Sequence, residues 1–355
     1  ISIVLLQLVI PLFNDFVGIS LISSEVFNWK FILSLISIAV LIGLVSSIYP
    51  AVFFSSFKAL TLMRGQLKSG KLSERIRNYM LLIQYSMSLI LIICALIVYQ
   101  QLNYFYSSDP GYNKDNIIGI NNINWSNSFT NKNSKAFAAE FERIPGVELV
   151  SVCDALPMNI YNGDQFFLDQ GDEKSVPLNF VLADENYLDL LSIDLKSGRY
   201  FNESIKTDVN GVIINETALI SLGFASSESA LNRKINNWSG EYKILGVVSD
   251  FHFWSLHSPV EPFAIFHSNS GVQANSPLQC LALKLNDKSM KDFENTVSNI
   301  EEVWASISPD SPFEYSILYQ TFKSAYQSEL KFGKVIGVFA FVTILIAILG
   351  FLGLL

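Results

Sequence analysis

The three histidines are the side chains whose types and spacing come closest to a metal site. His252 and His257 lie within residues 250–257, and His267 follows in the next segment. A zinc site would need His252 and His257 to converge with an acid such as Asp250 or Glu261. Alternation along a strand puts Asp250 and His252 on one face, whereas His257 lies beyond an expected turn. We therefore favour another role, in which these polar side chains close a strand-to-loop junction between aromatic residues.

Asp169, Asp172 and Glu173 form an acidic cluster that offers oxygen ligands for Ca²⁺. A solvated turn explains the same three residues without an ion, and we favour that interpretation. The sequence contains no Gly-x-Ser-x-Gly elbow, no His-Glu-x-x-His helix and no glycine-rich phosphate loop. We therefore expect no catalytic residues, no bound cofactor and no metal, and we do not expect an enzyme.

Cys153 and Cys280 lie in the polar part of the chain, and Cys94 lies in an apolar stretch. The first two could form a disulfide in an oxidising compartment. Each also fits a buried apolar position beside a strand, and spacing alone does not fix which cysteines pair. We favour unpaired core residues and leave the disulfide open.

Charge divides the chain into two regions. Apolar residues make up 50% of the 355 residues and charged residues 16%, which is too apolar for an ordinary soluble protein. Residues 103–330 hold 15 Lys and Arg against 29 Asp and Glu, and the rest of the chain is basic. Because an acidic domain binds nucleic acid poorly, we expect no nucleic-acid partner.

Uncharged apolar stretches lie on both sides of the acidic block, at residues 1–13, 31–57, 79–102 and 335–355. About 20 apolar residues cross the hydrocarbon core of a bilayer, so the last three stretches are long enough. The sequence begins inside the first stretch, which we interpret as the end of a cut span. We expect the chain to be a fragment of a longer polypeptide.

The linker at residues 58–78 carries most of the basic residues outside the acidic block. They are Lys58, Arg64, Lys68, Lys71, Arg75 and Arg77, against the single acid Glu74. The positive-inside rule places this linker in the cytoplasm, and alternation then places residues 103–330 outside. Anionic lipid head groups and a direct protein contact are equally good explanations of its charge.

The spans have the features of packing and transmission elements. No Asp, Glu, Lys, Arg or His lies inside a complete span, whereas ion-driven carriers use such residues. Gly43, Gly333 and Gly337 belong to small-residue patterns that let membrane helices approach closely. No helix breaker separates the third span from Pro110, or residues 319–330 from the fourth span. We therefore expect both helices to continue outward as a paired stalk.

The acidic block alternates strand-like and helix-like segments, which predicts a mixed α+β domain. Strands are expected at 116–120, 147–152, 176–183, 212–215, 242–249, 278–285 and 313–318, and helices at 132–143, 185–191, 216–222 and 288–307. The predicted fold class is membrane α-helical spans plus a mixed α+β extracytoplasmic domain, joined by a helical stalk.

Four segments, in this order along the chain, carry a family resemblance. They are Ile48-Tyr49-Pro50-Ala51 with the residues up to Gly70, Gly246-Val247-Val248-Ser249-Asp250-Phe251-His252-Phe253, Ser311-Pro312-Phe313-Glu314-Tyr315-Ser316, and Ala347-Ile348-Leu349-Gly350-Phe351-Leu352-Gly353-Leu354. In order and spacing they resemble the FtsX-like permeases of the MacB type, particularly the tandem-repeat forms of Bacteroidetes-like bacteria. The resemblance covers most of residues 49–355.

The resemblance implies a permease subunit of an ABC transporter in the bacterial inner membrane. Residues 1–57 would be the last two spans of a first repeat, 58–78 the cytoplasmic linker, 79–102 and 331–355 spans of a second repeat, and 103–330 a MacB-like periplasmic core domain with stalk helices. A separate ATPase would bind ATP, and the stalk would transmit its motion for efflux or extrusion of a substrate. The resemblance assigns no catalytic, cofactor-binding or metal-binding residue.

The implied partners are a cytoplasmic ABC ATPase subunit, membrane lipid, a homologous repeat that completes a dimer or pseudo-dimer, and a periplasmic or outer-membrane protein. The alternative is an extracytoplasmic sensor or receptor, because two spans around an α+β domain are also the plan of sensor kinases. A sensor needs only two spans, whereas the basic linker here leads straight into another span. We therefore prefer the permease.

Overall fold

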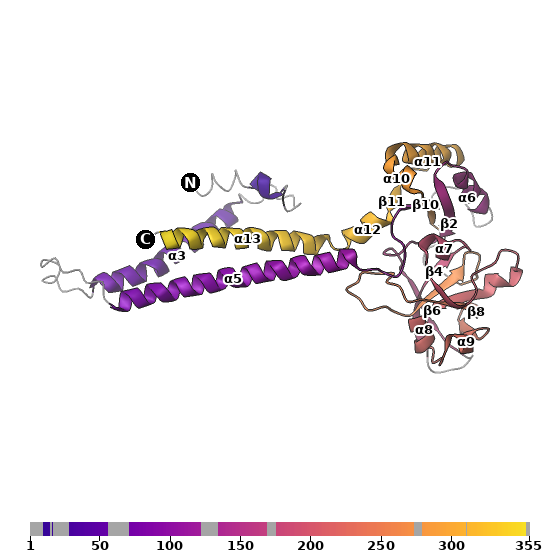
Figure 1. Cartoon of the computed structure of the whole chain (residues 1–355), viewed down its shortest axis with the longest axis horizontal. Coiled ribbons are helices and arrows are strands. Elements are labelled where there is room, and N and C mark those ends of the chain that lie inside the picture. The colour runs from indigo at the N-terminus through magenta and orange to yellow at the C-terminus, as the bar shows by residue number, and fades with distance from the viewer. Residues whose placement is uncertain are drawn as a thin grey trace. The chain divides into compact units, whose positions relative to one another are not determined.

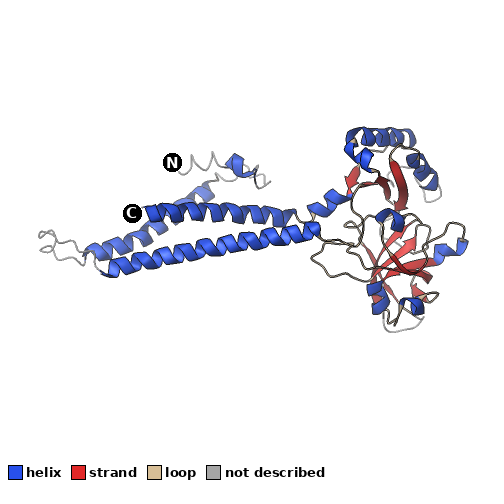
Figure 2. Ribbon diagram, in the orientation of Figure 1, coloured by secondary structure: helices blue, strands red, loops and turns tan. Residues whose placement is uncertain are grey.

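The computed structural model describes residues 10–14, 16, 28–55, 71–121, 134–168, 175–272, 279–309 and 311–352. It divides the chain into two compact units, which we call the helical unit and the sheet domain. The helical unit comprises Ile1–Tyr104 and Gln327–Leu355, and the sheet domain comprises Phe105–Tyr326. Figure 2 shows long helices in the first unit and strands in the second.

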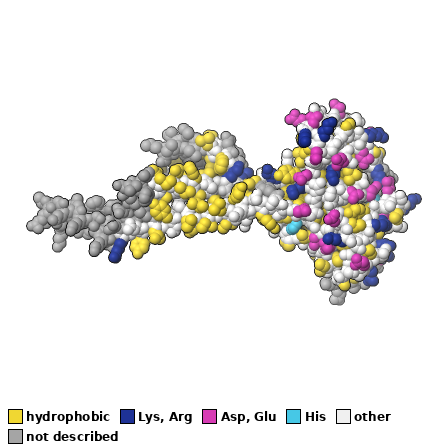
Figure 3. Space-filling view, viewed as in Figure 1, with side chains coloured by type: hydrophobic (Ala, Val, Ile, Leu, Met, Phe, Trp, Pro, Cys, Tyr) yellow, Lys and Arg dark blue, Asp and Glu magenta, His cyan; other side chains and the backbone are white. Residues whose placement is uncertain are grey.

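Three helices of the helical unit are long and apolar enough to cross a membrane. They are α3 (Trp29–Ser55), α5 (Lys71–Ser107) and α13 (Gln327–Leu352), with candidate spans at Trp29–Ile48, Leu82–Phe105 and Gln327–Leu349. Most of their large apolar side chains are exposed, and Figure 3 shows the apolar surface that they form. A surface of this kind suits lipid, because large exposed apolar patches are rare on soluble monomers.

These helices correspond to the spans predicted at 31–57, 79–102 and 335–355, and residues 1–9 of the first predicted span lie outside the described residues. The helix α5 begins at Lys71 and so includes the end of the linker predicted at 58–78. Residues 56–70 lie outside the described part of the chain.

Gly333 brings α13 close to α5 within the helical unit. A Cβ atom at Gly333 would lie 2.9 Å from Cγ1 of Val98, so only glycine fits without a shift of that side chain. Close packing is therefore confirmed at this glycine. For Gly43 and Gly337, no described atom lies within 4 Å of the corresponding position.

The predicted unbroken helix over residues 319–330 is wrong. The helix α12 (Leu318–Ser324) ends before Ala325, and α13 starts only at Gln327. The turn between them lets Tyr326 place its side chain in the sheet domain, where it is fully buried. This packing outweighs the helix propensity of a segment that has no Gly or Pro.

The sheet domain is mixed α+β, as expected, and its described residues form one sheet of eleven strands. The order is β11-β1-β10-β2-β4-β9-β6-β8-β5, with β3 paired to β4 and β7 paired to β8. The strands are β1 (Ile117–Ile120), β2 (Val147–Cys153), β3 (Asn162–Phe166), β4 (Val176–Ala183), β5 (Leu195–Gly198), β6 (Gly211–Asn215), β7 (Lys234–Asn237), β8 (Gly240–Val248), β9 (Phe263–His267), β10 (Cys280–Leu285) and β11 (Tyr315–Ile317).

A narrow joint divides this sheet into two halves. The strands β2 and β4 share a single pair of facing residues, Cys153 and Ala183. The first half contains β11, β1, β10 and β2, and the second half contains the other strands (Figure 1). The chain leaves the first half after β2 and returns to it at β10.

Helices flank the strands, and alternate strand residues enter two cores. The helices are α6 (Ser134–Glu142), α7 (Tyr187–Leu191), η2 (Lys206–Asn210), α8 (Glu216–Ser221), α9 (Ser227–Ala230), α10 (Asp287–Lys291), α11 (Phe293–Ile307) and α12. On β1, Ile118 and Ile120 enter one core and Ile117 enters the other, as the two-residue period of a strand requires. Each core contains side chains from both halves of the sheet.

The helix predicted at 288–307 is two helices, which is a second correction. The helix α10 ends at Lys291, because the φ of −112° and ψ of 50° at Asp292 are not helical, and α11 follows at Phe293. The side chain of Asn286 accepts a hydrogen bond from Ser289 N and so fixes the start of α10 at Asp287, one residue before the predicted start.

Candidate functional site

The segment 250–257 contacts both the place where the chain enters the sheet domain and the place where it leaves. We call this segment, together with Phe105, Pro110, Gly111 and Tyr326, the clasp. The segment begins just after β8 ends at Val248. Its aromatic residues Phe251 and Phe253 are buried, and the polar residue His252 lies between them in the sequence. The clasp is the candidate functional site.

At the entry point, backbone lies directly on backbone. Gly111 has a φ of +85°, and a Cβ atom there would lie 2.8 Å from the carbonyl oxygen of Asp250 and 2.9 Å from Cα of Phe251. The amide of His252 donates a hydrogen bond to the carbonyl of Pro110 at 2.7 Å. Position 111 therefore needs glycine for two independent reasons, its positive φ and its close contact.

At the exit point, one tyrosine holds several parts of the clasp. The backbone amide of Leu256 donates to the hydroxyl of Tyr326 at 2.8 Å. The ring of Phe105 stacks on the ring of Tyr326 with centroids 5.1 Å apart. The ring of His257 lies 4.8 Å from that of Phe105 and 5.4 Å from that of Tyr326. His257 is thus an aromatic packing residue here.

Further hydrogen bonds fasten the clasp to the interior of the domain. The carboxylate of Asp250 accepts from the backbone amide of Thr217 at 2.9 Å and from its hydroxyl at 2.7 Å, at the start of α8. The amide of Met158 donates to the carbonyl of Phe253 at 2.7 Å, and the indole of Trp254 donates to the carbonyl of Ile160 at 2.9 Å. The clasp is therefore bonded to two separate segments, the start of α8 and the loop that contains Met158 and Ile160.

The structure does not gather the predicted metal candidates. Asp250 bonds to α8, and Glu261 accepts a hydrogen bond from the side chain of Asn179 at 2.9 Å. His267 is buried against the ring of Phe201, and burial lowers its pKa. Within the described ranges, no group of three or more His, Cys, Asp or Glu is placed to hold a metal ion. Asp169, Asp172 and Glu173 lie outside those ranges.

Two buried aspartates fasten the narrow joint of the sheet, and the sequence analysis did not single them out. Asp154 accepts from the amide of Leu182 at 3.0 Å, and Asp184 accepts from the amide of Val152 at 2.7 Å and from the hydroxyl of Ser151 at 2.6 Å. Each carboxylate thus bonds across the joint to the other strand. Burial raises the pKa of Asp154 to about 7 and that of Asp184 to about 6, although these hydrogen bonds oppose the shift.

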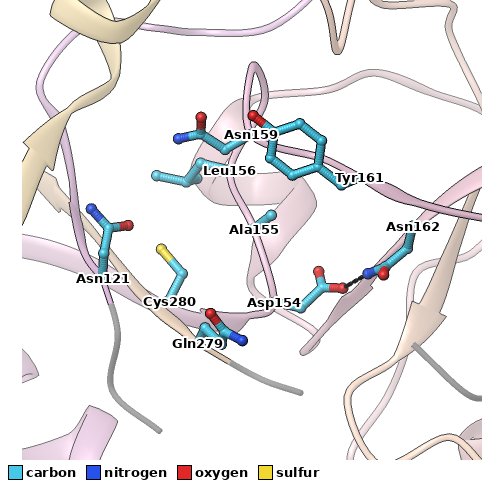
Figure 4. A pocket seen from close by; sticks show the side chains of 9 residues that line it. All are labelled: Asn121, Asp154, Ala155, Leu156, Asn159, Tyr161, Asn162, Gln279 and Cys280. Atoms are coloured by element: carbon cyan, nitrogen blue, oxygen red, sulfur yellow. Dashed lines mark hydrogen bonds between the residues drawn. The ribbon is translucent and has the colours of Figure 1, made fainter. Parts of the chain in front are cut away.

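A polar cavity of about 230 Å³ lies beside this joint. Figure 4 shows its lining, which consists of Asn121, Asp154, Ala155, Leu156, Asn159, Tyr161, Asn162, Gln279 and Cys280. The side chain of Asn162 donates to Asp154, and the sulfur of Cys280 lies on the opposite side of the cavity. Side-chain amides recur along its wall, but no motif in the sequence indicated that these residues would meet.

No protein-family model matches the sequence, and no curated protein matches it. Solved structures do show similarity. One is the periplasmic region of MacB from Actinobacillus actinomycetemcomitans, at 16% identity over 60% of this chain and 94% of that chain, with a TM-score of 0.42. Another is a domain of a putative permease protein from Porphyromonas gingivalis, at 16% identity over 53% and 84%, with a TM-score of 0.35. A third is the extracellular domain of the noncanonic ABC-type transporter YknZ from Gram-positive bacteria, at 11% identity over 57% and 98%, with a TM-score of 0.36.

Proposed function

We propose that this chain is a permease subunit of an ABC transporter that transmits ATP-driven motion to a periplasmic domain. The observation that carries the proposal is the clasp. The helix α5, which contains a candidate membrane span, ends at Ser107 inside the sheet domain, and α13 begins directly after Tyr326. Phe105 and Tyr326, at these two ends, stack on each other and both contact the segment 250–257.

This arrangement suits mechanical transmission better than chemistry. A displacement of the end of α5 acts on Pro110 and Gly111, which are bonded to or packed on residues 250–252. The clasp in turn is bonded to α8 through Asp250. Packed and hydrogen-bonded contacts of this kind carry a shift from one segment to the next because interiors are dense and hardly compressible.

The remaining parts of the proposal rest on the predicted membrane topology and on what the family resemblance implies. The sheet domain is periplasmic, the chain is an inner-membrane protein with several spans, and a separate cytoplasmic ABC ATPase binds ATP. A homologous repeat completes a dimer or pseudo-dimer, and the transported substrate is extruded with the help of a periplasmic or outer-membrane partner. Residues 58–78 form the cytoplasmic linker, where their positive charge also attracts anionic lipid.

The test uses the full-length protein purified from its own membrane. A nucleotide-binding ABC subunit is expected to co-purify with it, and the complex, but not the chain alone, is expected to hydrolyse ATP. In the complex, Tyr326→Ala is expected to retain ATP hydrolysis while substrate extrusion is lost. The matched control is Tyr161→Ala, because Tyr161 is 79% exposed and lies outside the clasp. Hydrolysis by the chain alone would contradict the proposal, as would equal extrusion by the two variants.

A further inference from the structure

Cys153 and Cys280 lie opposite each other in neighbouring antiparallel strands. They are paired residues at one end of the β2–β10 ladder. Facing residues in such a ladder have Cα atoms about 4.5 to 5.5 Å apart, within the range of about 4.4 to 6.8 Å that a disulfide spans. In the structure both cysteines are free thiols, as the sequence led us to expect, and both are buried, at 0% and 3% exposure.

The lack of a side chain at position 119 leaves room for the sulfur atom of Cys280. Gly119 of β1 lies beside Cys280, and a Cβ atom at that glycine would be only 3.1 Å from the cysteine sulfur. Any other residue at position 119 would therefore crowd the sulfur. Cys280 also lines the polar cavity at the joint, although its side chain is almost fully buried.

The position of the pair in the topology gives it a specific role. The chain leaves the first half of the sheet after Cys153, at the end of β2, and returns at Cys280, at the start of β10. Between them lie all the strands of the second half, from β3 to β9. A bond between these residues would join the two points where the chain crosses the joint.

We propose that Cys153 and Cys280 form a native disulfide that closes the second half of the sheet into a loop. One S–S bond forms and two S–H bonds break. The two protons and two electrons pass to a disulfide-bearing oxidant, whose own S–S bond is reduced to two thiols. The inference rests on the proposed periplasmic location, because thiols of proteins in the cytosol are kept reduced.

The bond forms before the strands close around the cysteines. Exchange proceeds through the thiolate, and in the folded domain burial raises the pKa of the Cys153 thiol well above its usual value. Exposed cysteines of the unfolded chain react faster than the buried pair does. The disulfide is therefore a structural bond made during folding, and the folded domain protects it from reduction.

The experiment uses the full-length protein in its membrane, with thiols trapped by N-ethylmaleimide under denaturing conditions. Digestion without reductant is expected to yield one linked peptide containing Cys153 and Cys280, which separates into two on reduction. Cys94, in the helical unit, is expected to be alkylated and serves as the internal standard for a free thiol. A reductant is expected to lower the unfolding temperature of the wild type but not that of the double variant Cys153→Ala, Cys280→Ala.

A second sample is denatured, treated with a disulfide-bearing oxidant and then refolded. In a separate measurement, intact cells are treated with a membrane-impermeant amine reagent, which labels the sheet domain only if that domain lies outside the cytoplasm. Alkylated cysteines in the first sample overturn the proposal. If they are linked in the second sample and the domain is unlabelled, the assumed location has failed, and the permease orientation fails with it. If the domain is labelled and the cysteines remain separate in both samples, only the pairing is wrong.

Discussion

The ring of Phe105 stacks on the ring of Tyr326, with an angle of 19° between their planes. Phe105 is the residue at which the chain enters the sheet domain, and Tyr326 is the residue at which it leaves. Aromatic pairs of this geometry contribute about 0.5 to 1.5 kcal/mol beyond the area that they bury. The contact therefore holds the two ends of the domain together.

Tyr326→Phe tests the hydrogen bond at this contact. The substitution keeps the ring but leaves the amide of Leu256 without its acceptor, so we expect the free energy of unfolding to fall by about 1 kcal/mol. Tyr326→Ala removes the buried ring as well and is expected to cost about 3 to 5 kcal/mol. Urea unfolding of the full-length protein in detergent measures both. An unchanged midpoint for Tyr326→Phe would show that the hydroxyl is not a significant partner of Leu256.

Gly111→Ala tests the close approach at the entry point. Three glycines separate its causes, because Gly111 has a positive φ and a close neighbour, Gly223 has a φ of +87° with no described atom within 4 Å, and Gly271 has neither feature. We expect Gly223→Ala to cost about 1 to 2 kcal/mol through φ alone and Gly111→Ala to cost more. Gly271→Ala is expected to be neutral. If Gly111→Ala and Gly223→Ala lowered the free energy of unfolding equally, the backbone at Asp250 would be able to move away from the new methyl group without an energetic cost.

Asp154→Asn tests the buried carboxylate at the joint by its pH dependence. An acid whose pKa is raised by folding favours the folded state below its unfolded value of 3.8 and loses that contribution as the pH rises to about 7. The wild type is therefore expected to lose on the order of 2 to 4 kcal/mol between pH 4 and pH 7.5 relative to Asp154→Asn, which does not titrate. Unfolding at both pH values measures this difference. The control is Asp189→Asn, because Asp189 is exposed. If this variant changed the pH dependence of the unfolding free energy as much as Asp154→Asn does, the assignment to Asp154 would fail.

Asp250→Ala tests the bond between the clasp and α8. The carboxylate satisfies the amide of Thr217 at the first turn of that helix, so we expect a loss of about 0.5 to 2 kcal/mol. Thr217→Val removes only the hydroxyl partner and is expected to lose less. A chelator is expected to leave the unfolding temperature of the wild type unchanged. A decrease with chelator that Asp250→Ala abolishes would instead favour a metal at this position.

Long apolar elements could be predicted from the sequence, whereas short polar strands could not. The buried strands β4 and β10 each carry a continuous or alternating apolar pattern, and their predicted positions agree with the structure. In contrast, β3 contains Asn, Gly, Asp and Gln, and β7 contains Lys and two Asn, so neither resembles a strand by composition. These two strands depend on their partners, since β3 lies along β4 and β7 along β8.

The clasp could be predicted only in part, because much of it consists of backbone contacts. The sequence indicated that polar residues of the segment 250–257 close a strand end between aromatic residues, and the structure places them there. The partners of that segment are Pro110, Gly111 and Tyr326, which are distant in sequence and belong to no shared motif. Their meeting depends on the topology of the whole sheet, which residue patterns alone do not fix.

The single facing pair at the joint has a consequence for how the two halves of the sheet are held. In a regular ladder, a strand that slides along its partner by one residue breaks every hydrogen bond between the two strands, so the ladder resists such sliding. Here few backbone bonds cross from one half to the other, and the halves are also held by the hydrogen bonds of Asp154 and Asp184 and by the shared apolar cores. Apolar contact has no preferred direction, so small relative rotations of the halves cost less than the same movement within either one.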